Sequence, residues 1–353
     1  MANNQGGKTV LVVGGAGFLG SNIVRMILAK CDSTEVSSIR MFDVSDAELE
    51  LESNPLSRIV VERVVGDVRD SDAVTRACRD VDVVIHAASI VDFGDKDSDF
   101  VRAVNVDGTR TIVDACLATG VTCLVYTSTE DVVITRTPLV DAVETDIYPP
   151  ESHLIYGSYG VTKQRAEKIV LRANGDNLVT CALRPVVLFG EGDPFNVTNA
   201  LGVAFRKIVV PVQAENQFSS CYVRNAAWAH VCAFRAALAR PEAIGGEAFF
   251  VTDDTPTCPY FDFLKPFADG LGYRYAPFKL PGSFLFGLVW LFERLAWIVK
   301  TPPMFRSGPM YGAMTTYTFS RQKAEEDLRY WPLYDFQESV RLSLPYYKRV
   351  LNA

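Results

Sequence analysis

Short apolar stretches alternate along the chain with segments whose apolar residues recur at helical spacing. Thr9 to Val13 are β-branched or aliphatic throughout, which is typical of a central parallel strand buried on both faces. Ser21 to Lys30 has apolar residues three and four positions apart, which predicts a helix. This alternation predicts an α/β fold with a doubly wound, Rossmann-like parallel sheet. Further strands are expected at 37–43, 59–68, 81–88, 123–129 and 247–252, with a later helix at 226–239.

Three glycines, Gly14, Gly17 and Gly20, separate the first predicted strand from the first helix. Gly14 permits a tight turn, Gly17 lets the backbone approach a pyrophosphate, and Gly20 lets the helix press against the sheet. The helix N-terminus adds N–H groups and partial positive charge. The spacing indicates a dinucleotide-binding turn, with an ordinary tight turn as the alternative, and we include Phe18 and Leu19 inside it among the expected cofactor contacts.

The ends of the next three strands carry further candidate cofactor contacts. Asp43 ends the second strand, 23 residues after Gly20, where a carboxylate would bind the ribose hydroxyls and repel a 2′-phosphate, which favours NAD over NADP. Asp67 and Val68 end the third strand beside the expected adenine; capping of the helix near Ser71 is the alternative for Asp67. Ala87 and Ala88 end the fourth, where small side chains let the backbone lie along the cofactor.

Candidate catalytic residues follow the dinucleotide motif. Tyr159 and Lys163 are four residues apart, so they share one face of a helix, and the ammonium would favour the phenolate. Tyr156 is the weaker candidate. The strand at 123–129 ends in hydroxyl side chains at the edge where parallel sheets bind ligands. Asn105 either holds a water or the backbone near the lysine, or starts a helix.

Composition and charge exclude several classes of function. The chain has 353 residues, of which 48% are hydrophobic and 22% charged, so it can bury a large core. The net charge of −7 is spread along the sequence without a basic stripe, which argues against a nucleic-acid partner. Eight scattered cysteines without a C-x-x-C pair indicate a reducing compartment and no metal site. We see no signal or transit peptide in the first ten residues.

With these motifs in this order, the chain resembles the extended short-chain dehydrogenase/reductase superfamily. The stretches around Trp228–His230, Asp253–Pro256 and 317–340 are similar to the 3β-hydroxysteroid dehydrogenase/Δ5-4 isomerase family. The resemblance implies NAD-dependent oxidation of a 3β-hydroxyl on a steroid or sterol by a Ser/Thr–Tyr–Lys group, in which Thr129 supplies the hydroxyl. It also implies that Pro185, in the segment after the catalytic helix, contacts the cofactor. His230 is interpreted as structural.

The resemblance leaves alternatives for the reaction. Isomerisation of a Δ5-3-ketone needs a proton shuttle, for which Asp253 and Asp254 are candidates; the alternative is a turn in which they bond the local backbone. Other reactions to consider are decarboxylating oxidation of a sterol 4-carboxylate and a sugar-nucleotide epimerase or dehydratase. A catalytically silent NAD-sensing scaffold is the alternative outside the enzymes.

Two domains are expected. Residues 8–190 would bind NAD, joined by returning segments at about 221–252, and 191–220 with 255–353 would bind the substrate. The apolar stretch 281–299 is interrupted by Glu293 and Arg294, so it predicts a helix at a membrane interface, anchored by Trp290 and Trp297, or a wall of the substrate cavity. We expect a homodimer on the cytoplasmic face of the endoplasmic reticulum, or in the cytoplasm if soluble.

Overall fold

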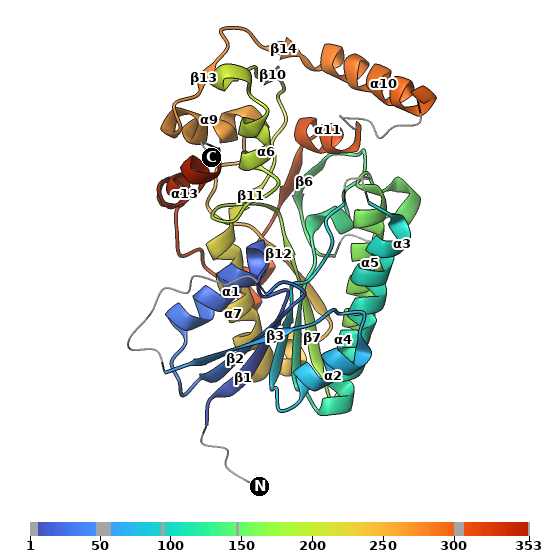
Figure 1. Cartoon of the computed structure of the whole chain (residues 1–353), viewed down its shortest axis with the longest axis vertical. Helices are drawn as coiled ribbons and strands as arrows, with labels where there is room; N and C mark the ends of the chain where they lie inside the picture. Colours follow the sequence, from blue (N-terminus) through green and yellow to red (C-terminus); the bar gives the residue numbers. More distant parts are fainter. Residues whose placement is uncertain (1–5, 47–57, 93–95, 146–147, 300–306, 352–353) are drawn as a thin grey trace.

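A seven-stranded parallel sheet forms the centre of the computed structural model, which describes residues 6–46, 58–92, 96–145, 148–299 and 307–351 (Figure 1). The strand order reverses between β1 and β4, and in such sheets ligands bind at the carboxyl ends of the strands beside this switch point. The predicted doubly wound fold is therefore confirmed. Across the sheet the strands are β12 (Glu247–Val251), β7 (Val179–Pro185), β5 (Cys123–Thr127), β4 (Val83–His86), β1 (Lys8–Val13), β2 (Val36–Asp43) and β3 (Val60–Val65).

Helices cover both faces of this sheet. Val10 and Val12 of β1 point into a core shared with two helices, α1 (Phe18–Lys30) and α7 (Val223–Ala239). Leu11 and Val13 point into a second core on the opposite face. Both faces of β1 are therefore buried, which is why the strand reads as an uninterrupted apolar run. The helices of the second face are α2 (Ser71–Cys78), α4 (Gly108–Thr119) and α5 (Gly157–Arg172), and the short α3 (Ser98–Arg102) precedes α4.

The remaining elements pack around a separate aromatic core above the carboxyl ends of the strands (Figure 1). Phe189, Phe263 and Phe267 contact one another edge to face or tilted in this core. The division of the chain at about residue 190 stays a prediction. The helices here are α6 (Val197–Gly202), α9 (Tyr260–Gly270) and α13 (Phe336–Leu351). Parallel pairs join β8 (Val187–Phe189) to β11 (Ser220–Tyr222), β9 (Ile208–Val209) to β13 (Arg274–Tyr275), β10 (Val212–Gln213) to β14 (Leu280–Pro281), and β6 (Leu139–Ala142) to β15 (Tyr317–Phe319).

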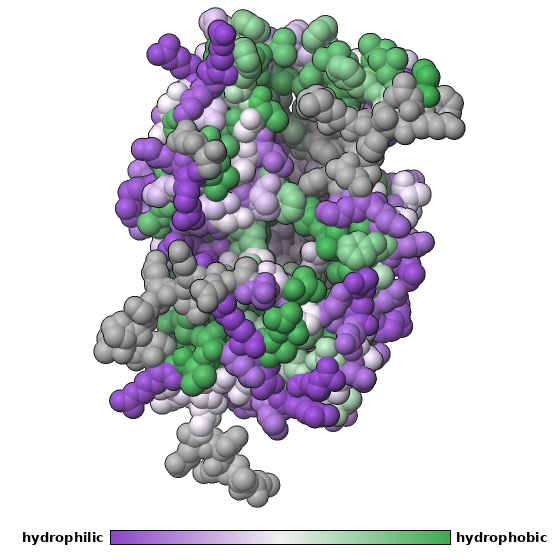
Figure 2. Space-filling model, in the orientation of Figure 1, coloured by the Kyte–Doolittle hydropathy of each residue, from purple (hydrophilic) through white to green (hydrophobic). Residues whose placement is uncertain are grey.

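The apolar stretch at 281–299 forms α10 (Gly282–Val299), which lies at the edge of the molecule beside α11 (Ser307–Met314) (Figure 1). Figure 2 shows hydrophobic residues gathered over α10 and a hollow beneath it. Within the described ranges, none of the helices combines the length and apolar character that crossing a bilayer demands. The side chain of Trp297, one of the two expected anchors, lies outside the described residues. The other short helices are α8 (Pro241–Ile244) and α12 (Gln322–Asp327).

Candidate active site

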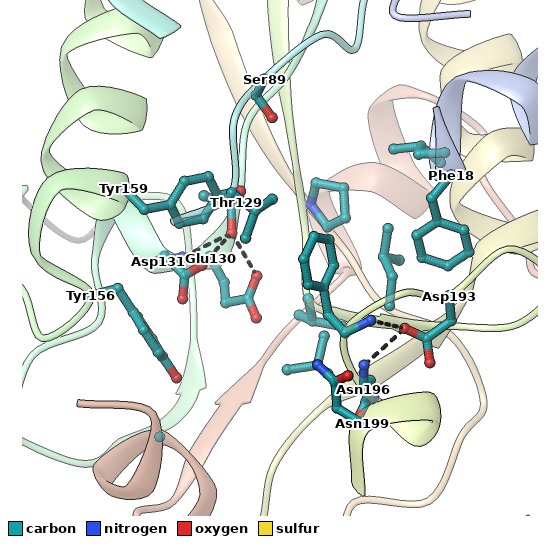
Figure 3. Close-up of a pocket in the computed structure, with 18 of the residues that line it drawn as sticks. Phe18, Ser89, Thr129, Glu130, Asp131, Tyr156, Tyr159, Asp193, Asn196 and Asn199 are labelled. Atoms are coloured by element: carbon teal, nitrogen blue, oxygen red, sulfur yellow. Dashed lines mark hydrogen bonds between the residues drawn. The ribbon is translucent and has the colours of Figure 1, made fainter. Parts of the chain in front are cut away.

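A cavity of about 1410 Å³ runs from the glycine turn at the switch point to the inner side of α10. Figure 3 shows the part of it in which Tyr159 and Thr129 on one wall face Phe18 and Asn196 on the other. The cavity combines the expected cofactor and catalytic positions in one space. The predicted site residues that line it are Gly14, Gly17, Phe18, Leu19, Gly20, Asp43, Asp67, Val68, Ala87, Ala88, Thr129, Tyr159, Lys163 and Pro185.

The glycine turn leaves no room for side chains. Gly14 has a φ of +83°, and a Cβ there would lie 2.6 Å from the backbone nitrogen of Ala88. A Cβ on Gly20 would lie 2.0 Å from the carbonyl oxygen of Gly14. The turn therefore brings the N-terminus of α1 against the ends of β1 and β4. This close backbone cradle fits a pyrophosphate.

The two strand-end aspartates have different local roles. The carboxylate of Asp43 accepts hydrogen bonds from the backbone nitrogens of Ala16 and Ser45, both at 3.0 Å, so the glycine turn holds its orientation at the cavity. Asp67 forms a salt bridge with Arg69, whose guanidinium lowers the pKa of that carboxyl. The cap of α2 is Asp70, which accepts from the backbone nitrogens of Asp72 and Ala73. The capping alternative for Asp67 is thus wrong.

Tyr159 and Lys163 lie on one face of α5 and are buried at the cavity. The Nζ of Lys163 donates to the carbonyl oxygen of Thr127 at 2.6 Å and lies 4.3 Å from the centre of the Tyr126 ring. Burial lowers the pKa of Lys163 to about 7, against the opposing charges of Glu167 and Asp131. The ammonium is therefore aimed at the end of β5, where the strand meets α5.

The hydroxyl of Thr129 is the centre of a small polar cluster (Figure 3). Its Oγ1 lies 3.0 Å from Oε2 of Glu130 and 3.0 Å from Oδ2 of Asp131, on the same wall of the cavity as Tyr159 (Figure 3). Both carboxyls line the cavity. Glu130 and Asp131 are not among the site residues predicted from the sequence. Two acidic residues directly after a buried strand could have indicated them, because ligands bind at the carboxyl ends of parallel strands.

These carboxyls reverse the expected acidity of Tyr159. The sequence predicts that Lys163 lowers the pKa of the phenol, whereas in the structure burial and the charges of Asp131 and Glu130 raise it well above its usual value. The reason is tertiary: Lys163 points to the carbonyl of Thr127, and the two acidic side chains face Tyr159. In the protein without cofactor or substrate, Tyr159 is therefore protonated at neutral pH.

Asn105 lies inside a helical stretch, in a π-helical turn at Ala103–Asp107, so the helix-start interpretation is wrong. Its Nδ2 donates to the carbonyl of Ile90 at 3.0 Å and to Thr162 Oγ1 at 3.1 Å, and its Oδ1 accepts from the nitrogen of Ile90 at 2.7 Å. Ile90 lines the cavity, whereas Asn105 does not. Asn105 therefore holds the cavity wall to the residue before Lys163.

Asp253 and Asp254 lie away from the cavity lining. The Asp253 carboxylate accepts from the backbone of Tyr222 at 2.8 Å, the amide of Asn225 at 2.8 Å and the backbone of Thr255 at 2.9 Å. Asp254 is exposed and pairs with Arg321 at 2.7 Å. Their position therefore does not support a role in isomerisation, because neither side chain borders the space in which Tyr159 lies.

His230 is buried between two partners, with Nε2 2.8 Å from Thr127 Oγ1 and Nδ1 2.8 Å from the carbonyl of Ala226. Burial lowers its pKa to about 4, so the ring is neutral at pH 7. The bond to Thr127 fixes the end of β5, next to the carbonyl that Lys163 binds. His230 thus helps to position Thr127, whose carbonyl oxygen accepts the hydrogen bond from Lys163.

The comparisons with known proteins agree over most of the chain. Residues 11–281 match the model of the 3-beta hydroxysteroid dehydrogenase/isomerase family. The 3 beta-hydroxysteroid dehydrogenase type 7 of Mus musculus is 35% identical, with 93% of this chain and 92% of that protein covered. The Homo sapiens protein of the same name is 34% identical over the same shares.

Solved structures are similar in fold at lower identity. The UDP-glucose-4-epimerase of Stenotrophomonas maltophila, determined with NAD and formylated UDP-arabinopyranose, has a TM-score of 0.75 at 16% identity, covering 98% of this chain and 99% of that one. MoeE5 in complex with UDP-glucuronic acid and NAD has a TM-score of 0.70 at 17% identity, covering 97% and 99%.

Proposed function

The chain belongs to the 3-beta hydroxysteroid dehydrogenase/isomerase family, and from that premise we propose that it oxidises the 3β-hydroxyl of a steroid or sterol to the 3-ketone with NAD. The observation that carries the proposal is the position of Tyr159 and Lys163. They lie beside Thr129 at the carboxyl end of β5, on a cavity that reaches apolar residues of α10.

The cofactor end of the cavity fits NAD. The backbone cradle at Gly14 and Gly20 suits a pyrophosphate, and the oriented carboxylate of Asp43 would accept hydrogen bonds from the adenosine ribose. Structural relatives of the same fold were solved with NAD. When bound, the nicotinamide supplies the hydride acceptor for C3 of the substrate.

The catalytic residues would divide the proton chemistry. Tyr159 takes the proton of the 3β-hydroxyl, and Thr129 hydrogen-bonds the same oxygen. Lys163 holds the nicotinamide ribose and opposes the negative charge that develops on Tyr159. This ammonium is anchored by the carbonyl of Thr127, so its position is set before substrate binds.

The lining of the cavity favours a steroid over a sugar nucleotide. Leu285 and Val289 of α10 contribute to a wall with many apolar residues. A second pyrophosphate would need cations, and among the described lining residues these are Lys96 and Lys163. Lys163 serves the catalytic group, so the epimerase or dehydratase alternative lacks a cationic clamp.

The carboxyl pair beside Thr129 also disfavours a sterol 4-carboxylate. Carbon 4 is bonded to carbon 3, so an anionic group there would lie near this pair, and the negative charge of the pair would repel it. We therefore place neutral 3β-hydroxysteroids ahead of the decarboxylating substrate.

A substrate screen tests the proposed function. Purified protein is given NAD with a panel of neutral 3β-hydroxysteroids, sterol 4-carboxylates and UDP-sugars, while NADH absorbance and product mass are followed. NADH formation with the neutral steroids supports the proposal, and an ultraviolet band of a conjugated enone would add isomerisation. Conversion of UDP-sugars alone, or NAD binding without turnover of any panel member, would overturn it in favour of the epimerase or the scaffold.

Cofactor choice gives a first mutational prediction. Asp43→Ala should raise the ratio of NADP to NAD activity, because the carboxylate that would repel a 2′-phosphate is lost. Steady-state kcat/KM with both cofactors measures this ratio. Asp254→Asn is the control, since that carboxyl pairs with Arg321 away from the cavity. A wild-type protein that already prefers NADP would contradict the ribose assignment.

We further propose that α10 contacts the membrane from which a steroid enters. Leu285 and Val289 line the cavity, while Phe284, Trp290 and Ile298 are 60%, 57% and 65% exposed. A helix with one apolar side on the cavity and another in solvent would connect a bilayer surface to the active site. We also propose that the chain forms a homodimer and that this homodimer lies on the cytoplasmic face of the endoplasmic reticulum. If α10 is only a cavity wall, the chain acts in the cytoplasm instead.

Vesicle flotation checks this contact. Wild-type protein should float with phosphatidylcholine–phosphatidylserine vesicles, and the Phe284→Ser/Trp290→Ser/Ile298→Ser variant should lose most of that binding, because the exposed apolar side of α10 is removed. Trp331→Ser is the matched control, as Trp331 is 58% exposed outside α10. Equal flotation of the triple variant and the control would exclude α10 as the contact.

A further inference from the structure

Two carboxyl groups that the proposed chemistry leaves unused meet at one hydroxyl. Glu130 is buried, and Asp131 lies half-buried in the cavity wall. Each has an oxygen 3.0 Å from Oγ1 of Thr129. Figure 3 shows both side chains beside Thr129, on the same wall as Tyr159.

The geometry requires a proton on this pair. A threonine hydroxyl has a single hydrogen, so it can donate to only one of the two carboxylates at a time. If both were ionised, the second would face Oγ1 without a hydrogen and would repel the first. Both short contacts become hydrogen bonds when one carboxyl is protonated and donates to Oγ1. The arrangement is therefore that of a carboxyl pair sharing one proton.

The surroundings decide which carboxyl carries the charge. Lys163 of α5 faces Asp131 and lowers its pKa, while Tyr159 of α5, Tyr156 just before α5 and Tyr317 of β15 feel the charge of Asp131. Burial raises the pKa of Asp131 to about 7, and burial together with the charge of Asp131 raises the pKa of Glu130 well above its usual value. Asp131 is half-buried and feels the charge of Lys163, whereas Glu130 is buried, so we assign the negative charge of the pair to Asp131 and the shared proton to Glu130.

We propose that Asp131 is the terminal acceptor of the proton that leaves the substrate, reached from Tyr159 through the hydroxyl of Thr129, with protonated Glu130 holding that hydroxyl in place. This inference rests on the proposed oxidation, but it gives the single hydrogen of Thr129 to Asp131 in place of the hydrogen bond from Thr129 to the substrate oxygen. It gives a buried phenol a route to lose its proton, which the charge of Lys163 alone does not provide, since the pKa of Tyr159 is raised.

The step is balanced in protons and electrons. The substrate O–H bond breaks and its proton passes to the Tyr159 oxygen, the tyrosine proton passes to Thr129 Oγ1, and the threonine proton passes to the Asp131 carboxylate. The C3–H bond breaks as a hydride, the C3–O bond becomes a carbonyl, and NAD⁺, the oxidant of the proposed function, is reduced. Asp131 then releases the proton to the cavity water.

The test compares Asp131→Asn with Glu130→Gln, both of which keep the size of the side chain. In the wild type, kcat/KM for oxidation should fall as the pH drops through about 7, since protonated Asp131 cannot accept a proton. An opposite fall as the pH rises through about 7 belongs to Lys163, which loses its charge there. Asp131→Asn should lower kcat at least about tenfold and remove the acid limb, whereas Glu130→Gln should retain that limb. Asp254→Asn is the surface control.

An infrared spectrum provides a readout that does not depend on turnover. Exposed carboxyls are ionised at pH 7, so a protonated Glu130 should contribute a carboxylic-acid C=O band to the difference spectrum of wild type minus Glu130→Gln. This band reports the shared proton even if Asp131→Asn folds poorly, which circular dichroism and thermal unfolding would show.

The outcomes separate the two proposals. A wild-type protein that turns over no 3β-hydroxysteroid overturns the proposed function, while the infrared band still tests the shared proton. If the wild type is active, an Asp131→Asn variant with unchanged kcat and an intact acid limb overturns the relay. A missing infrared band overturns the shared proton in either case.

Discussion

Tyr159→Phe is expected to reduce kcat for 3β-hydroxysteroid oxidation by ~10²- to 10⁴-fold, the usual contribution of a general base. The substitution removes only the phenolic oxygen that takes the substrate proton. Affinity for NAD should remain nearly unchanged, because the glycine cradle and Asp43 are untouched. Single-turnover NADH formation and NAD titration by protein fluorescence measure the two quantities.

The competing tyrosine provides the contrast. Tyr156 also lines the cavity, three residues before Tyr159 on the chain, but the hydroxyl of Thr129 lowers the pKa of Tyr159. A Tyr159→Phe protein that keeps a tenth or more of the wild-type kcat, with Tyr156→Phe inactive, would move the base to Tyr156. Thermal unfolding of both variants checks that activity and not folding has changed.

Lys163→Ala is expected to weaken two properties together, because one ammonium serves Tyr159 and the nicotinamide ribose. Loss of a charged hydrogen bond of ~1.5–3 kcal/mol predicts about ten- to hundredfold weaker NAD binding. We expect kcat to fall by about 10²-fold or more, since the charge opposing the tyrosinate is also lost. Isothermal titration at pH 6.5, below the pKa of Lys163, measures the affinity for NAD, and steady-state kinetics at pH 7 measure kcat.

Lys168→Ala is the matched control on the same helix. Its ammonium donates to Gln164 Oε1 at 2.7 Å and lies over the Tyr148 ring, with no place in the cavity lining. Unchanged NAD affinity in Lys163→Ala would remove the ribose contact from the proposal. Loss of NAD affinity with kcat intact would instead remove the lysine from the proton chemistry.

Three sequence interpretations depended on contacts that spacing cannot reveal. Asp67 was a possible cap of α2, but Asp70 stands directly before the helix and accepts from its first turn, while Asp67 pairs with Arg69. The sequence left Asn105 either holding a water or backbone near the lysine or starting a helix, and the π-helical turn places its amide against the backbone of Ile90. Asp253 follows a buried strand as a catalytic acid could, but three donors from β11, α7 and its own turn hold it outside the cavity.

The sequence by itself determined the features that depend on local conformation and periodicity. Alternating apolar stretches specify the parallel sheet, the glycines specify the turn at positive φ, and the end of β2 specifies the place of Asp43. The four-residue spacing on α5 puts Tyr159 and Lys163 on one face. Each of these follows from backbone geometry within one strand, turn or helix.

Only the tertiary structure decided the electrostatics of the site and the position of α10. The pKa of Tyr159 depends on Glu130 and Asp131, which follow β5 and reach α5 by packing across the carboxyl end of the sheet. The side of α10 that lines the cavity is set by contacts with segments distant in sequence. Desolvation and charge act through space, so a residue's partners along the chain do not determine its acidity or its exposure.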